Sequence, residues 1–186
     1  MVRIPEWAKC ARKGKLFSAR EWEQEQFDGS VKIFEWVKRF DSIQWIMIEW
    51  DAIVLPYEIQ PARTEWNYGL WGWMLEEWEV PDEAMAREFL EETGMIWDIT
   101  FWKTLSKTWY VSRDEHFYII RNTKKVQAPT PDAWWEKIEI KKMSFDEFVA
   151  ILIAPWFRNS TFANAMIREY ILPGKQEEFK KVLFGN

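Results

Sequence analysis

Three glutamates in one short segment are the residues of this chain best suited to chemistry. Glu88, Glu91 and Glu92 stand at positions i, i+3 and i+4, so in a helix their carboxylates share one face. Like charges this close repel one another and destabilise a helix unless a cation lies over them. Carboxylate oxygens are the ligands that Mg²⁺ and Mn²⁺ prefer. The spacing therefore indicates a divalent-metal site, although an arbitrary acidic helix face is usually only solvated.

The residues around these glutamates form a longer pattern. Glu79 lies eight positions before Arg87, and residues 87–95 read Arg-Glu-Phe-Leu-Glu-Glu-Thr-Gly-Met. This stretch resembles the Nudix box, in which a glycine, five residues, a glutamate and seven residues precede Arg-Glu-apolar-x-Glu-Glu-x-Gly-apolar. Every defining position matches except the first glycine, where this chain has Trp73 preceded by Gly72. Residues 22–25 and 27–30 also look like the N-terminal hairpin of the ADP-ribose pyrophosphatase branch of this family.

The resemblance implies an enzyme that hydrolyses a nucleoside-diphosphate derivative, either ADP-ribose or a nucleotide sugar, to a nucleoside monophosphate and a sugar phosphate. Mg²⁺, or Mn²⁺ in its place, would polarise the diphosphate and activate water. The implied metal ligands are the carbonyl near Gly72 and the side chains of Glu79, Glu88, Glu91 and Glu92. Arg87, Glu91 and Glu92 would take part in catalysis, with Arg87 and Glu79 supporting the other carboxylates.

Further candidates lie outside the box. A general base in this family often comes from a later loop, and we take Glu136 as the candidate and Glu115 as the second, with an ordinary surface role equally open for each. Arg63 is the candidate contact for a substrate phosphate, or else a surface residue. His116, the only histidine, is expected to be structural, and Cys10, the only cysteine, to be incidental.

Tryptophans replace residues that are usually small in the box. Trp73 takes the glycine position and Trp78 stands just before Glu79, where glycine is also common. A β-carbon forbids backbone angles and close approaches that glycine permits, so we expect the metal loop to be distorted. The alternative function is therefore a catalytically impaired or engineered Nudix scaffold. Its tryptophan-rich surface, drawn from 15 tryptophans in all, would serve binding or assembly.

The elements that must position these residues alternate between strands and helices. Strands are predicted over residues 15–27 and 31–40 around an Asp28-Gly29 hairpin turn, and then over 42–50, 52–59, 99–105, 115–121 and 136–143. Residues 62–80 are predicted to form a long loop. Helices are predicted over 82–93, ending at Gly94, and over 144–154, 159–172 and 175–183. The order predicts an α/β (α+β) fold, the Nudix-type α/β/α sandwich with a mixed sheet. We divide it into an N-terminal hairpin extension, residues 1–40, and a Nudix domain, residues 41–186.

Composition limits the partners. The chain has 186 residues of which 48% are hydrophobic, enough for one sizeable core. Its formal net charge of -5 argues against binding to a nucleic-acid polymer, and no apolar run approaches the roughly 20 residues that cross a membrane. We expect a cytoplasmic protein without a secretion signal, acting on a small molecule. The family resemblance of the hairpin implies a homodimer, for which the aromatic residues are suited.

Overall fold

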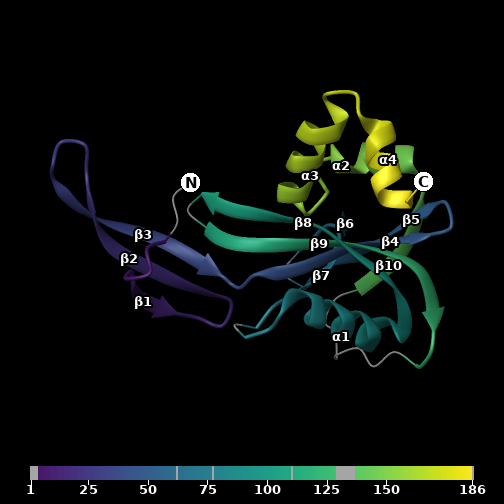
Figure 1. The fold of residues 1–186 in the computed structure, drawn as a ribbon, viewed down its shortest axis with the longest axis horizontal. Helices are drawn as coiled ribbons and strands as arrows, with labels where there is room; N and C mark the ends of the chain where they lie inside the picture. The colour runs from purple at the N-terminus through teal and green to yellow at the C-terminus, as the bar shows by residue number, and fades with distance from the viewer. Residues whose placement is uncertain (1–3, 62, 77, 110, 129–136, 186) are drawn as a thin grey trace.

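A long mixed sheet forms the centre of the molecule (Figure 1). The computed structural model describes residues 4–61, 63–76, 78–109, 111–128 and 137–185. Neighbouring strands in the sheet are β1 (Lys9–Lys13), β2 (Phe17–Glu25), β3 (Val31–Arg39), β9 (Val111–Lys125), β4 (Ser42–Glu49), β5 (Ala52–Ile59) and β10 (Lys137–Met143). Off this path, β6 (Asn67–Tyr68) pairs with β5, β7 (Trp71–Met74) with β4, and β8 (Met95–Trp109) with β9. Strand β9 runs parallel to β3 and β4 while the other pairs are antiparallel, so the predicted mixed sheet is confirmed.

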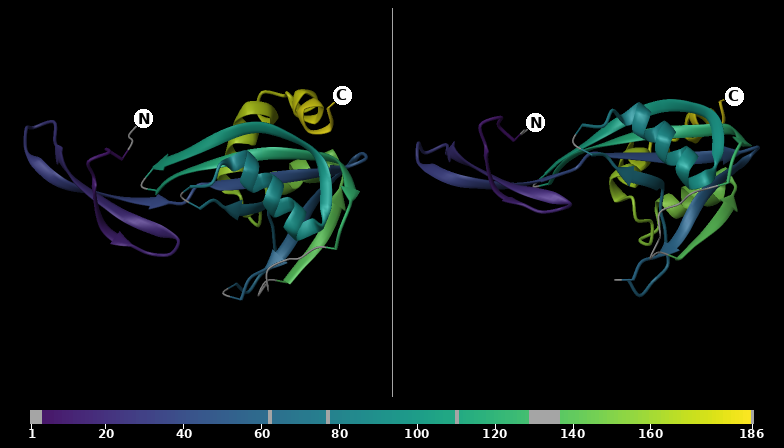
Figure 2. Two further views of the ribbon diagram at one scale, coloured as in Figure 1. Left: turned by 60° about the horizontal axis from the view of Figure 1, so that its bottom comes forward. Right: turned by 90° about the horizontal axis from the view of Figure 1, so that it is seen from below.

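Helices cover both faces of this sheet (Figures 1 and 2). Helices α2 (Phe145–Leu152), α3 (Ser160–Met166) and α4 (Gln176–Phe184) lie on one face, and α1 (Pro81–Thr93) lies on the other. Successive residues of a strand point to opposite faces. Phe117 and Ile119 of β9 accordingly pack in the core under α2 to α4, whereas Tyr118 and Ile120 pack in the core beside α1. The α/β/α sandwich is therefore confirmed.

Residues at the two ends of helix α1 explain where it begins and ends. Pro81 lies in its first turn with Asp82 and Glu83, whose negative charge suits the N-terminal end of a helix. Gly94 ends it in the left-handed conformation with φ 67° and donates its N–H to the Leu90 carbonyl. A β-carbon on Gly94 would lie 2.3 Å from the carbonyl oxygen of Gln127, so glycine is required here for both reasons. The predicted helix and its cap are confirmed.

The N-terminal hairpin projects away from the rest of the sheet (Figures 1 and 2). Strands β2 and β3 pair over their full length around Gly29, whose φ is 79°, as the Asp-Gly signal predicted. The hairpin has a small core of its own, formed by Ala8, Trp22 and Trp36. Strand β1, which adds to its edge, was not expected because all five of its residues are exposed and show no apolar alternation. The boundary at residue 40 between an extension and a second domain stays a prediction.

Three sequence-based expectations need correction. The segment 62–80 is not a continuous loop, because it contains β6 and β7. Strands β8 and β9 are 15 residues each, more than twice their predicted lengths, because their pairing with each other extends beyond the predicted segments at both ends. The predicted helix over residues 159–172 is α-helical only to Met166 and continues as a π-helical turn, η1 (Ile167–Ile171). The capping box that opens α2 is confirmed, with Ser144 and Glu147 bonded reciprocally.

Of the helices in the described ranges, none is long and apolar enough to cross a bilayer.

Candidate functional site

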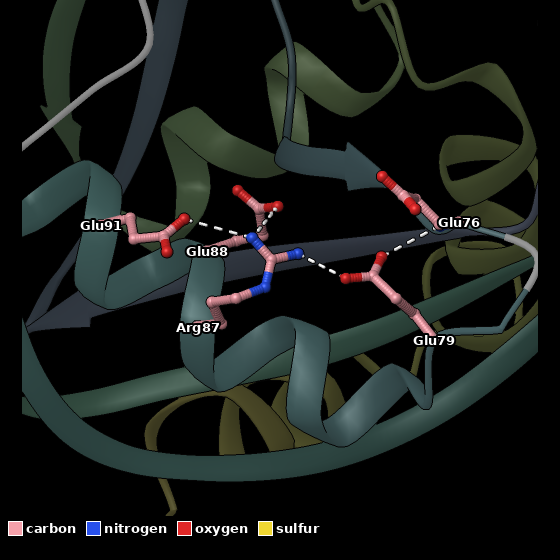
Figure 3. A network of polar contacts seen from close by, with 5 residues as sticks. All are labelled: Glu76, Glu79, Arg87, Glu88 and Glu91. Carbon is pink, nitrogen blue, oxygen red and sulfur yellow. Dashed lines mark hydrogen bonds and ion pairs between the residues drawn. The ribbon is translucent and has the colours of Figure 1, made fainter.

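Arg87 lies at the centre of the acidic residues that the sequence singled out (Figure 3). Its Nη2 donates to Glu79 Oε1 at 2.5 Å, and its Nη1 lies 2.8 Å from Glu88 Oε1 and 3.1 Å from Glu91 Oε2. We call these four residues the Arg87 cluster. Glu88 and Glu91 come from α1 itself, whereas Glu79 approaches from the segment that precedes the helix. Helical spacing thus brings two of the three predicted metal ligands of α1 to one guanidinium.

The turn before α1 positions Glu79. Its carboxylate Oε2 accepts the backbone N–H of Glu76 at 3.0 Å, and its own N–H donates to the Glu76 carbonyl at 3.1 Å. The N-terminal end of the helix is fixed to the sheet by Tyr118, whose hydroxyl donates to Asp82 at 2.6 Å. Burial and the hydrogen bond to Asp82 raise the pKa of Tyr118, so this contact persists through the neutral range. The sheet and the turn together hold the carboxylates in place.

The electrostatics of the Arg87 cluster are unbalanced. The Glu79 and Glu88 side chains are only 8% and 7% exposed, while the Arg87 side chain is 44% exposed. Burial raises the pKa of Glu88 although the charge of Arg87 opposes that shift. Burial disfavours the charge of Arg87, but its hydrogen bond to Glu79 and the charge of Glu88 outweigh this and raise its pKa. Three carboxylates around one guanidinium leave an excess of negative charge in a partly dry setting.

The other predicted residues are less closely gathered. Glu92 is half-buried on α1, and Gly72 lies in β7 opposite Gln44 of β4. Arg63 is exposed between β5 and β6 and does not line the pocket described below. Glu136 lies outside the described residues. Glu115 is buried and forms an ion pair with Arg113.

The described carboxylates are not arranged as a preformed metal site. Across residues 4–61, 63–76, 78–109, 111–128 and 137–185, no group of three or more His, Cys, Asp or Glu side chains is placed to hold a metal ion. In this arrangement Glu88 and Glu91 face Arg87 instead. Their oxygens are nevertheless hard donors of the kind that Mg²⁺ prefers, and burial raises the pKa of Glu88. The donor chemistry fits a divalent cation, which would compete with Arg87 for the same oxygens.

Trp73 adopts an ordinary strand conformation. It lies in β7 opposite Ile43, and it is absent from the described non-glycine residues with positive φ, which are Trp50 and Asn122. It packs against the core beside α1. The glycine that the chain does need is Gly72, because a β-carbon there would lie 2.7 Å from the Ile43 carbonyl oxygen.

The remaining loop tryptophans differ in burial. Trp71, expected in a loop, packs on the core beside α1, stacks on Trp45 and donates to the Val54 carbonyl at 3.2 Å. Trp66 is half-buried and Trp78 is 77% exposed. Trp134 and Trp135 lie outside the described residues.

A pocket of about 320 Å³ adjoins the Arg87 cluster. Glu76, Glu79 and Pro81 line it on the α1 side, and His116 of β9 also contributes. The N-terminal hairpin forms much of the remaining wall and supplies four cationic residues, namely Lys13, Arg20, Lys38 and Arg39. We call this cavity the hairpin pocket. It places basic and acidic side chains around one space.

Arg39 is half-buried and lies near a second arginine. Burial and the charge of nearby Arg113 lower its pKa, and Glu115 offsets this only in part. A guanidinium in this setting gains from an additional anion. The hairpin pocket is therefore suited to a phosphate group on the hairpin side.

Comparison with known proteins adds evidence about the fold. No family model and no curated protein matches the chain. Among solved structures, one named "Crystal structure of ADP compounds hydrolase" aligns with a TM-score of 0.68, covering 90% of this chain and 94% of that chain at 19% identity. The fold is similar to that of a Nudix hydrolase. At this identity the likeness establishes the architecture of the Nudix-like fold and leaves the chemistry to the residues themselves.

The four cationic residues that line the hairpin pocket were not recognised from the sequence. The hairpin was interpreted only as a dimerisation element, because strand patterns do not reveal which distant loop a strand end will face. The one available signal was the basic pair Lys38-Arg39, which lies at the end of a predicted strand and two residues before Asp41. Lys38 Nζ bonds Asp41 Oδ1 at 3.1 Å, so this pair is fixed beside the start of β4.

Proposed function

We propose that the protein hydrolyses a nucleoside-diphosphate derivative, ADP-ribose or a nucleotide sugar, with the help of Mg²⁺ or Mn²⁺. The observation that carries the proposal is the charge arrangement at the hairpin pocket, which is lined both by cations of the hairpin and by Glu76 and Glu79, the latter a member of the Arg87 cluster. A diphosphate requires cations for its outer oxygens and a carboxylate-bound metal for the reacting ones. The pocket offers the cations, and the adjoining Arg87 cluster offers the carboxylates. The structural neighbour, which is called an ADP compounds hydrolase, agrees with this substrate class.

The metal would be held by carboxylates of α1. Glu88, Glu91 and Glu92 are the proposed side-chain ligands, with Glu79 and the carbonyl near Gly72 supporting them. When bound, the ion would polarise the phosphoryl oxygens and lower the pKa of a coordinated water.

The chain's own residues have separate tasks in the proposed reaction. Arg39 and Lys38 would bind the phosphate that does not react, while Arg87 keeps Glu79 directed toward the pocket through their hydrogen bond. Water forms the new bond to phosphorus, the bridging P–O bond breaks, and the water's proton passes to a general base. Glu136 stays the candidate for that base. The products are a nucleoside monophosphate and a sugar phosphate.

A second candidate is a catalytically silent scaffold, natural or engineered. It is favoured by the orientation of Glu88 and Glu91, which face Arg87, and by the tryptophan at the glycine position of the box. In that case the tryptophan-rich surface would serve binding or assembly.

Turnover assays separate the two candidates. ADP-ribose, NADH, nucleotide sugars and nucleoside triphosphates are incubated with the protein, with Mg²⁺ and with a chelator, and phosphate-containing products are separated by chromatography. Metal-dependent cleavage that is lost in Glu92→Gln supports the hydrolase, and Glu178→Gln, an exposed glutamate of α4, is the matched control. Absence of turnover on every substrate, together with its appearance in Trp73→Gly, would support the silent scaffold instead.

The proposed homodimer rests on the exposed apolar residues of the hairpin. Phe27, Val31 and Ile33 are fully or largely exposed, which is costly in an isolated chain. Light scattering tests the dimer, and Phe27→Asp with Ile33→Asp should shift the mass toward the monomer. We also propose that the protein acts in the cytoplasm, and fractionation of cells tests this location.

A further inference from the structure

A second cavity lies among aromatic side chains that do not line the hairpin pocket. It has a volume of about 360 Å³ and is lined by Tyr57 of β5, Glu65 and Trp66 from the connection to β6, Tyr68 of β6, and Trp156 after α2. We call the four rings the aromatic cage. Its volume is at the lower end of the range for small-molecule sites, roughly 300–1,000 Å³.

The backbone holds the walls of the aromatic cage together. Tyr57 and Tyr68 are paired residues of β5 and β6. The Arg158 N–H donates to the Tyr68 carbonyl at 2.8 Å, and Tyr68 and Phe157 form a parallel bridge. These contacts keep the segment that carries Trp156 against β6, although the two are far apart in the sequence. The cage is thus a built feature of the fold.

Three of the rings contact one another at the edge of the core and line the cavity together with Trp156. The centroid of Tyr57 lies 5.3 Å from that of Trp66, with 25° between the planes, and 4.6 Å from that of Tyr68, with 39° between the planes. Trp66 and Tyr68 are half-buried, and Trp156 is 52% exposed. A cluster of partly exposed aromatic residues around a cavity is typical of a ligand-binding surface.

The charge around the cage favours a cation. The faces of aromatic rings are electron-rich and attract cations. Lys141 already lies with its Nζ 5.6 Å from the centroid of Tyr57 and is bound by Glu139 at 2.6 Å, so this lysine has its own counter-ion. Glu65 adds a carboxylate to the lining of the cavity, which would repel the phosphate of a nucleotide. Electron-rich faces together with a carboxylate are complementary to an alkylated ammonium ion.

We propose that the aromatic cage binds a small alkylammonium ion, of the trimethylammonium class, at a site separate from the hairpin pocket. The methyl groups would contact the ring faces, and Glu65 would supply the counter-charge. The site does not depend on the proposed hydrolase activity, because its lining residues and those of the hairpin pocket are different.

The test compares choline with its uncharged carbon analogue, 3,3-dimethylbutan-1-ol, using saturation-transfer NMR and calorimetric titration of the full chain. We expect choline to bind and the neutral alcohol to bind at least about tenfold more weakly. Trp156→Ala should weaken choline binding about fivefold, the size of one cation–π contact. Glu65→Gln removes the counter-charge and should weaken binding by a similar factor of about five. Trp50→Ala, which removes an indole that is 93% exposed at the β4–β5 turn, is the matched control and should bind choline normally.

Three results would overturn the proposal. They are equal binding of choline and the alcohol, no binding of either, and choline binding that Glu65→Gln and Trp156→Ala leave unchanged. Glu65→Gln removes only a charge from an exposed side chain, so it stays informative if Trp156→Ala misfolds.

Discussion

Replacement of Arg87 by methionine tests whether the Arg87 cluster is held together by charge. Methionine keeps much of the length of the side chain and removes the guanidinium that contacts Glu79, Glu88 and Glu91. Loss of one partner from a fully buried ion pair costs about 3–5 kcal/mol. Because the Arg87 side chain is 44% exposed, water screens part of the repulsion that remains. We therefore expect the free energy of unfolding to fall by about 2 kcal/mol.

Urea denaturation followed by circular dichroism measures this loss. Glu88→Gln in the Arg87→Met background removes one of the uncompensated carboxylates and should recover about half of the stability. Mg²⁺ should stabilise Arg87→Met more than the unchanged chain, because the ion no longer competes with the guanidinium and its binding to the folded state adds directly to stability. Arg168→Met, at an exposed position of η1, is the matched control and should change stability little.

The outcome that contradicts this reasoning is specific. If Arg87→Met is as stable as the unchanged chain and Mg²⁺ affects neither protein, the carboxylates do not form a charged cluster in solution. If Mg²⁺ stabilises both proteins equally, it binds at a place other than the oxygens that face Arg87.

Three further predictions concern the elements that carry the site. Gly72→Ala places a β-carbon 2.7 Å from the Ile43 carbonyl oxygen and should lower the free energy of unfolding by about 1–3 kcal/mol in urea denaturation. An unchanged stability would mean that β7 shifts to accommodate the methyl group. Phe89→Ala empties a fully buried position of α1 and should cost about 3–5 kcal/mol, measured in the same way. Tyr118→Phe removes the hydrogen bond to Asp82 and should cost about 1.5 kcal/mol near neutral pH. The pKa of Tyr118 is raised above the ordinary value of 10.0, so the stability that its protonated hydroxyl contributes is complete below pH 10.0 and is lost as the pH rises through the raised pKa. The difference in the free energy of unfolding between Tyr118→Phe and the unchanged chain should therefore shrink at alkaline pH.

The acidic helix was predictable because its signals are local. Pro81 in the first turn, the spacing of Glu88 and Glu91, and the glycine at 94 each act within a few residues of their own position. The helix bounds, its cap and the shared face of two carboxylates were therefore predicted correctly without any tertiary contact. The role of Arg87 was only partly anticipated, because its contact with Glu79 depends on how the preceding turn folds back.

The hairpin pocket was not predictable, since it joins segments that approach only in the folded chain. Arg39 faces the pocket because β3 lies parallel to β9 at residues 37 and 38, a long-range pairing that no periodicity encodes. Dependence on long-range pairing also explains why strands β6 and β7 were not predicted. They are short, and their pairing to β5 and β4 depends on partners that are also non-local.

The tryptophan at the glycine position of the box changes packing more than backbone conformation. Alternation along β7 places Trp71 and Trp73 toward the core beside α1, while Gly72 faces the other way and permits the close approach to Ile43. The two indoles therefore fix β7 against the same core that α1 covers. Trp73→Gly would remove buried apolar surface without supplying any positive φ that the strand requires. The proposed hydrolysis therefore does not depend on a strained β7, and it instead requires that Glu88 and Glu91 exchange Arg87 for a metal ion.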